Sequence, residues 1–170
     1  MRLYFSTILV ALFSSFTAMP PKEWLMLKTA EYSIQYPQNW KTDLSGLLGT
    51  RFILFSPKDS AGIRTYVNLS VQPESGDSIS VDSLLSINKA QLPFSIENYQ
   101  FVSSEIVKSN GIESFRLCYS GIQGKKQMKW IQQGFLYKKH YYTLIFTASE
   151  GNYNKFHTLG IEILNTLKIY

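Results

Sequence analysis

The stretch FVSSEIVKSNGIESFRLCYSG, residues 101–121, indicates the fold class because it predicts two antiparallel strands joined by a tight turn. In its second half, apolar and polar side chains alternate: Phe115, Leu117 and Tyr119 stand between Ser114, Arg116 and Cys118. That period of two is typical of a strand whose two faces differ. Asn110-Gly111 is a strong signature of a two-residue hairpin turn. The chain therefore builds an antiparallel sheet here.

The strand pattern continues toward the C-terminus. Residues 123–126 predict a second turn, which leads into a strand over 128–137. Lys138-Lys139 predicts a third turn, followed by a strand over 141–148. We expect these strands to form an antiparallel meander with successive turns at opposite ends.

The N-terminal half adds three strands, over residues 32–36, 51–56 and 65–72, each followed by a proline. Two helices complete the pattern. One begins at Ser80, whose hydroxyl suits an N-cap, and ends at Pro93. The other follows Ser149 and carries an apolar stripe. The sequence thus predicts an α+β fold, with two main helices packed on an antiparallel sheet of six to seven strands.

The first eighteen residues have the order of a secretory signal peptide. Met1 and Arg2 precede a mostly apolar run over 3–13, and small residues lead to Ala18. The run is shorter than the roughly 20 residues that span a bilayer. We expect cleavage near Ala18, a connector over 19–30 and one domain over 31–170. Because Cys118 is the only cysteine, no internal disulfide is possible, which suits a bacterial periplasmic or extracellular protein.

Several motifs resemble the PsbP-like superfamily, whose types include PsbP, DcrB, LpqN and Mog. YSIQYPQNW, residues 32–40, resembles the family's Y-x-I-x-Y-P-x-x-W start, and Phe55-Ser56-Pro57 follows it. The run from Gly134 to Thr147, before the last helix, resembles the family's ending. The similarity covers residues 30–170 and implies an αβα sandwich. Members of this family mostly bind or scaffold, and no functional residue of theirs can be matched here.

Catalytic motifs are absent from the sequence. His140 and His157 have no histidine, cysteine or carboxylate at a metal-ligand spacing of three or four residues, so we expect no metal site. Cys118 sits in the middle of a strand, where a half-buried apolar role is usual. No nucleophile elbow, phosphate loop or zinc-protease motif occurs. We therefore expect no enzyme and no cofactor.

Seven residues are candidates for contact with a partner: Lys125, Lys126, Lys129, Lys138, Lys139, Trp130 and Tyr141. The lysines suit an acidic partner or anionic lipid, or else they protect turns and strand edges from aggregation. The aromatic side chains form either an exposed binding patch or ordinary core. The formal net charge of +5 falls to +4 when Arg2 leaves with the leader, and it is spread along the chain, which does not favour nucleic acid.

The sequence accordingly predicts an exported, non-catalytic binding or accessory protein of the bacterial cell envelope. An alternative is a carrier or sensor of a small apolar ligand or lipid, and a third is an unrecognised hydrolase. A carrier needs an apolar cavity of about 300 Å³ or more. An enzyme needs a cleft whose titratable groups have perturbed pKa values.

Overall fold

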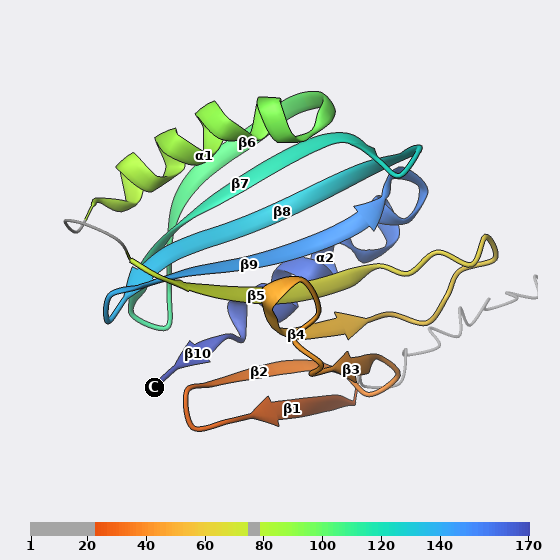
Figure 1. Cartoon of the computed structure of the whole chain (residues 1–170). Coiled ribbons are helices and arrows are strands. Elements are labelled where there is room, and N and C mark those ends of the chain that lie inside the picture. Colours follow the sequence, from red (N-terminus) through yellow and green to blue (C-terminus); the bar gives the residue numbers. More distant parts are fainter. Residues whose placement is uncertain (1–22, 75–78) are drawn as a thin grey trace, which may run out of the picture.

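Seven strands form one antiparallel sheet at the centre of the fold (Figure 1). The computed structural model describes residues 23–74 and 79–170, so the expected leader lies outside the described residues. The sheet order is β3-β4-β5-β9-β8-β7-β6. Its strands are β3 (Lys41–Asp43), β4 (Thr50–Phe55), β5 (Tyr66–Pro73), β6 (Glu97–Ser109), β7 (Ile112–Gln123), β8 (Lys126–Tyr137) and β9 (His140–Ser149). The expected meander is confirmed in β6 to β9.

The hairpin turns are two residues long and have the backbone that such turns need. Asn110 and Gly111 have φ values of 51° and 83°, which match the predicted turn between β6 and β7. Gly124 and Lys125, with φ values of 58° and 67°, join β7 to β8. These left-handed conformations follow the twist of the flanking strands and set the register of the whole meander.

A second, three-stranded sheet lies beside the first and was not expected from the sequence. It contains β1 (Trp24–Lys28), β2 (Tyr32–Pro37) and β10 (Lys168–Ile169), with β2 in the middle. The small sheet corrects two expectations from the sequence. The expected connector over 19–30 includes β1, and the strand predicted over 32–36 belongs to this small sheet. The pairing of β10 with β2 brings residues 168–169 beside residues 32–33.

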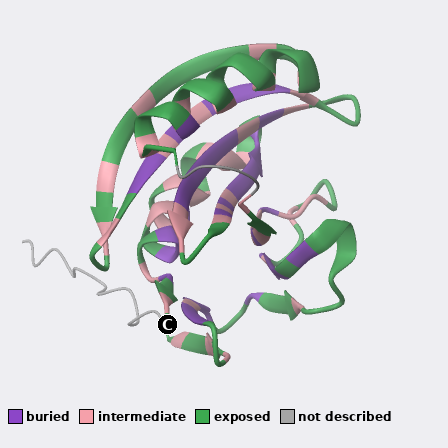
Figure 2. Cartoon of the chain, turned by 60° about the vertical axis from the view of Figure 1, so that its left-hand side comes forward, coloured by how far each residue is buried: buried purple, intermediate pink, exposed green. Residues whose placement is uncertain are grey.

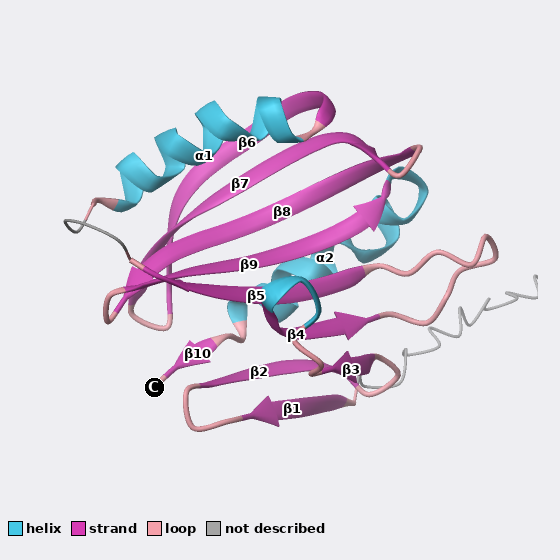
Figure 3. Ribbon diagram, viewed as in Figure 1, coloured by secondary structure: helices cyan, strands magenta, loops and turns pink. Residues whose placement is uncertain are grey.

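The two helices cover opposite faces of the large sheet (Figure 3). α1 (Val81–Ser95) packs on β6, β7 and β8, and α2 (Glu150–Asn165) packs mainly on β8 and β9. A short 3₁₀ helix, η1 (Leu47–Gly49), precedes β4. This arrangement is the α+β layered fold that the sequence predicts.

The larger part of the core lies between α2, the small sheet and the large sheet. Ile163 and Leu164 of α2 meet Ile34 of β2 and Phe146 of β9 there. On the opposite face, α1 is exposed over most of its surface (Figure 2), and Leu84 is its one buried residue. Leu84 packs against side chains of β7 and β8: Phe115, Leu117, Tyr119, Met128 and Trp130. α1 is therefore held by a smaller apolar cluster than α2.

Pro93 does not end α1, contrary to the expectation. The helix continues to Ser95, where the N–H of Ile96 donates to the carbonyl of Leu92 at 3.1 Å. Proline lacks the N–H that would bond four residues back, and in the last turn this removes only one helical hydrogen bond. The N-cap prediction is confirmed, because the Ser80 hydroxyl accepts the N–H of Ser83 at 3.1 Å.

Candidate functional site

The turn between β8 and β9 consists of two lysines in the left-handed backbone region. Lys138 and Lys139 have φ values of 46° and 58°. The other two hairpins of the meander each place a glycine in this turn, whereas this one has none. A non-glycine residue in this region costs about 1–3 kcal/mol, and such strain gathers at functional sites. The sequence therefore keeps two cations at a position where asparagine and glycine would fold more easily.

A hollow of about 190 Å³ opens beside this turn, where the small sheet meets the large one. Its lining comes from segments far apart in the chain. The residues are Glu31, Arg51, Val71, Lys138, His140, Tyr142 and Tyr170. We refer to this hollow together with Lys138 and Lys139 as the turn site.

Local contacts hold the lysine turn against the C-terminal strand. The Lys138 ammonium donates to the carbonyl of Tyr170 at 3.2 Å and lies 5.1 Å from the centre of the Tyr137 ring. The His140 ring Nδ1 is 2.9 Å from the Lys138 carbonyl oxygen. The Tyr170 hydroxyl is 2.7 Å from the Ser33 hydroxyl of β2. The turn site is thus tied to both sheets.

Tyr142 supplies a polar atom to the wall of the hollow. Its ring is only 9% exposed and stacks on Phe135, with ring centres 5.0 Å apart. Burial raises the pKa of the Tyr142 hydroxyl, Glu31 adds to the rise, and Arg51 opposes it. The hydroxyl therefore stays protonated at neutral pH and can donate a hydrogen bond.

Hydrogen-bond donors and cations outnumber acidic groups in the turn site. Arg51 and Lys138 contribute cationic side chains, the Tyr142 hydroxyl is a donor, and Glu31 is the one acidic side chain among the lining residues. Lys139 adds a further exposed charge at the turn. The arrangement suits an acidic group such as a carboxylate, because arginine and lysine form charge-assisted hydrogen bonds to it.

The structure divides the predicted contact lysines into two groups. Lys125 and Lys126 lie at the start of β8, whereas Lys138 and Lys139 follow its end, 12 residues later. That strand length separates the groups by roughly 35 Å. Lys129 faces α2, where it lies 3.6 Å from the Glu150 carboxylate and over the Tyr153 ring. The five lysines therefore do not form one continuous contact surface.

The two predicted aromatic contact residues lie beneath α1. Trp130 is 7% exposed and stacks on Tyr119, with ring centres 5.2 Å apart, so its side chain belongs to the core. Tyr141 is half-buried, and its hydroxyl accepts from the Asn88 amide of α1 at 3.2 Å. The sequence allowed these rings to form either an exposed patch or part of the core. The structure places both of them in the packed region beneath α1.

Sequence reasoning missed Glu31, Arg51, Tyr142 and Tyr170 as members of the site. Each comes from a different segment, and no spacing along the chain relates one to another. The only sequence signal for this site was the absence of a glycine from the turn at residues 138–139.

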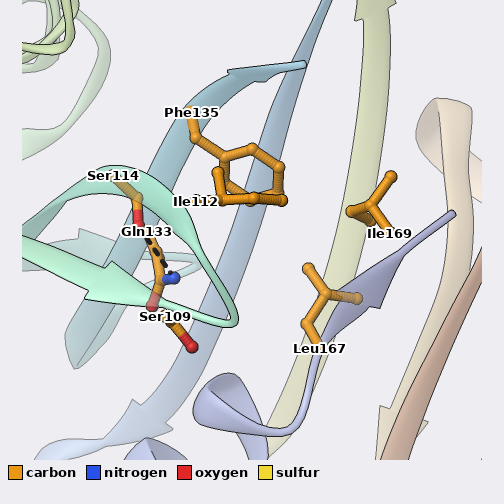
Figure 4. Close-up of a pocket in the computed structure, with 7 residues that line it drawn as sticks. All are labelled: Ser109, Ile112, Ser114, Gln133, Phe135, Leu167 and Ile169. Carbon is orange, nitrogen blue, oxygen red and sulfur yellow. Dashed lines mark hydrogen bonds between the residues drawn. The ribbon is translucent and has the colours of Figure 1, made fainter. Parts of the chain in front are cut away.

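The enclosed cavity in Figure 4 is too small for a ligand. It measures about 10 Å³ and is lined by Ser109, Ile112, Ser114, Gln133, Phe135, Leu167 and Ile169. Inside it, the Gln133 amide donates to the Ser114 hydroxyl at 3.1 Å. A single water needs about 10–15 Å³, and ligand pockets begin near 300 Å³. This cavity therefore does not support the carrier alternative.

The residues considered for catalysis have ordinary surroundings. Cys118 is half-buried, and burial raises the pKa of its thiol, which opposes formation of a nucleophilic thiolate. Within residues 23–74 and 79–170, no three histidine, cysteine or carboxylate side chains gather as metal ligands would. Over the same residues, no helix has the length and apolar character to cross a membrane.

Solved structures of other proteins have a fold similar to that of this chain. No family model and no curated protein matches the chain. Cyanobacterial PsbP (CyanoP) from Synechocystis is a similar solved structure, with a TM-score of 0.63 and 11% identity over 93% of this chain and 99% of that one. LpqN of Mycobacterium tuberculosis, described as involved in cell envelope biogenesis, has a TM-score of 0.68 and 10% identity over 88% and 92%. PA94 of Pseudomonas aeruginosa, of unknown function, has a TM-score of 0.61 and 10% identity over 84% and 94%.

The chain therefore has a PsbP-like fold, as the motifs at both ends of the domain predicted. At such low identity the likeness does not extend to function.

Proposed function

We propose that this chain is an exported, non-catalytic accessory protein of the bacterial cell envelope that binds an acidic protein partner through the turn site. The observation that carries the proposal is the pair of left-handed lysines, Lys138 and Lys139, beside the hollow. The turn is strained, and it places two cations where the central strands β8 and β9 meet. A binding role accounts for both features.

Export is supported by the signal-peptide pattern over residues 1–18. LpqN, which shares the fold, is described as involved in cell envelope biogenesis, and this is consistent with an envelope setting. In that setting the partner is another exported protein or the exposed domain of a membrane protein.

Charge favours an acidic surface on the partner. Arg51 and Lys138 line one hollow with Tyr142, which offers a neutral donor, and Lys139 is exposed in the adjoining turn. Such contacts raise the association rate and set orientation more than they raise affinity, and salt weakens them. We therefore expect binding that falls steeply as ionic strength rises.

A carrier of a small apolar ligand remains the second candidate. One opening, lined partly by Leu84, Leu136 and Ile79, lies at the start of α1 and measures about 210 Å³. That volume is below the usual lower bound of about 300 Å³ for a ligand pocket.

The test is native mass spectrometry of the protein purified gently from its host's exported fraction. The wild type is compared with Lys138→Asn/Lys139→Gly, which removes both cations and keeps the turn type. The matched control is Gly124→Asn/Lys125→Gly, which makes the same turn at the other end of β8. We expect a stoichiometric acidic protein with the wild type and the control, and its loss from the Lys138/Lys139 variant.

Two results would contradict the proposal. Retention of the partner by Lys138→Asn/Lys139→Gly would show that it binds elsewhere. A stoichiometric small apolar adduct without a protein partner would favour the carrier.

A further inference from the structure

The N-terminus of α2 opens onto a second hollow, at the end of β8 opposite the turn site. This hollow is open to solvent and measures about 720 Å³. The first turn of the helix lines it, together with the loop that precedes β5. Lys58 from the loop and Lys155 from the second turn of α2 also face it.

Ser149, the N-cap of α2, is a buried polar residue without a partner. It is 8% exposed, lines the hollow and makes no hydrogen bond to the first turn of the helix. Within the described part of the chain its hydroxyl has no hydrogen-bond partner. Ser80, the N-cap of α1, does accept the N–H of Ser83. A serine in this position normally caps the helix, so the Ser149 hydroxyl is left available to a group in the hollow that this residue lines.

The backbone beside Ser149 is accessible for close approach. The first N–H groups of a helix have no partner within the helix and carry its positive end. Gly151 has no side chain to cover them, and a Cβ placed there would meet no atom within 4 Å. The space beside Gly151, at the start of α2, is therefore open.

The carboxylates that line the hollow already have partners within the protein. Asp59 accepts the N–H groups of Ala61 and Ile63 and the side-chain amide of Asn152. These hydrogen bonds, with that of Ile63 first, lower the pKa of Asp59. Glu150 lies 3.6 Å from the Lys129 ammonium. Among the described residues neither Lys58 nor Lys155 forms an ion pair, and the Lys155 ammonium lies 5.2 Å from the centre of the Phe156 ring.

We propose that the N-terminus of α2 binds a phosphate group, held by the N–H groups of Gly151 and Asn152 and by the Ser149 hydroxyl. Lys58 and Lys155 supply the compensating charge. Helix N-termini bind phosphate because their N–H groups and their dipole both favour an anion. The group is either inorganic phosphate or the headgroup of a phospholipid. This inference is independent of the turn site.

Inorganic phosphate is the first probe. The amide resonances of the ¹⁵N-labelled domain are followed during a phosphate titration, with chloride holding the ionic strength constant. We expect saturable shifts centred on residues 149–152. Ser149→Ala should weaken binding about tenfold through the lost hydrogen bond to a charged group. Gly151→Ala should weaken it at least as much, because its Cβ occupies the approach to the N–H groups.

Both variants are expected to fold. Alanine at position 151 favours the helix and meets no neighbouring atom. Ser80→Ala is the matched control, since it removes an N-cap serine far from the hollow and should leave phosphate binding unchanged. Shifts that follow only ionic strength, or equal affinity in wild type, Ser149→Ala and Gly151→Ala, would overturn the proposal.

A second arm distinguishes the two sources of the phosphate group. The protein is sedimented with vesicles that contain phosphatidic acid, with and without inorganic phosphate, and with phosphatidylcholine vesicles as reference. Sedimentation that phosphate reverses and Gly151→Ala abolishes assigns the site to a lipid headgroup. Saturable phosphate shifts without sedimentation assign it to a soluble phosphate.

Discussion

Gly160 of α2 lies directly against the ring of Phe146 on β9. A Cβ placed on Gly160 would stand 2.4 Å from Cδ2 of that ring, well inside van der Waals contact. Phe146 is fully buried beneath the helix. The helix approaches the sheet this closely because residue 160 has no side chain, and this contact sets the depth of the main core.

Gly160→Ala should therefore lower the free energy of unfolding by about 1–3 kcal/mol, since overpacking forces the ring or the helix to move. Gly151→Ala, in the same helix, should leave it unchanged or raise it by up to about 1 kcal/mol, because alanine is the better helix former. Urea unfolding of both variants measures the difference. Equal effects of the two substitutions would show that the contact does not limit the packing.

The two N-cap serines should differ in their contribution to stability. Ser80→Ala removes an existing cap hydrogen bond and should cost about 1 kcal/mol. Ser149→Ala removes a hydroxyl without such a bond and should cost clearly less. Thermal unfolding in a buffer free of phosphate and sulfate makes the comparison. A larger loss from Ser149→Ala would mean that its hydroxyl caps α2 in solution.

Relief of strain in the β8–β9 turn should stabilise the fold. Lys138→Asn/Lys139→Gly places in this turn the residues that two-residue hairpins prefer, and it should raise the free energy of unfolding by about 1 kcal/mol or more. Gly124→Asn/Lys125→Gly should change it less, because a glycine already occupies that turn. Urea unfolding checks both. A destabilised Lys138/Lys139 variant would show that the lysines serve folding instead of binding.

Tyr119 should make the fold sensitive to alkali. Burial is the main reason that its pKa is raised well above the usual value of about 10. An unfolded tyrosine ionises near pH 10, whereas the folded one stays protonated. The stability from Tyr119 is therefore complete below about pH 10 and is lost as pH rises further, toward the folded pKa.

Tyr119→Phe should reduce this loss, which urea unfolding at about pH 8 and pH 11 would measure. At neutral pH the variant should itself cost about 1–3 kcal/mol, because the buried Gln132 loses the hydroxyl that donates to it at 3.1 Å. Tyr99→Phe, at a more exposed ring, serves as control. An unchanged pH dependence in Tyr119→Phe would assign the alkaline loss to other groups.

Export predicts a new N-terminus. If the leader is cleaved after Ala18, the mature protein begins at Met19. N-terminal sequencing and intact mass of the exported protein measure this directly. Arg2→Glu should slow export, since it removes the positive charge that precedes the apolar run. An exported protein that still carries residues 1–18 would contradict the prediction.

Local patterns predicted six of the seven strands of the large sheet and missed the short β3. Alternation around Leu117, the Asn110-Gly111 turn and the proline after each early strand are signals that neighbouring residues carry by themselves. Strand β1 and the pairing of β2 with β10 escaped prediction, because partners 137 residues apart, such as Ser33 and Tyr170, leave no local pattern. Pro93 was misplaced because a proline in the last turn of a helix looks the same in sequence as one that ends it.

The sequence by itself determined the α+β class, the antiparallel meander and the two helices, because hydrophobic period and turn chemistry act over a few residues. Only the tertiary structure decided which polar groups meet. It brought Glu31, Arg51 and Tyr142 to the lysine turn, placed Trp130 in the core and left the Ser149 hydroxyl without a cap hydrogen bond to α2. The physical reason is that a site depends on contacts between distant segments, which are set by sheet order and packing and not by the local preference of any residue.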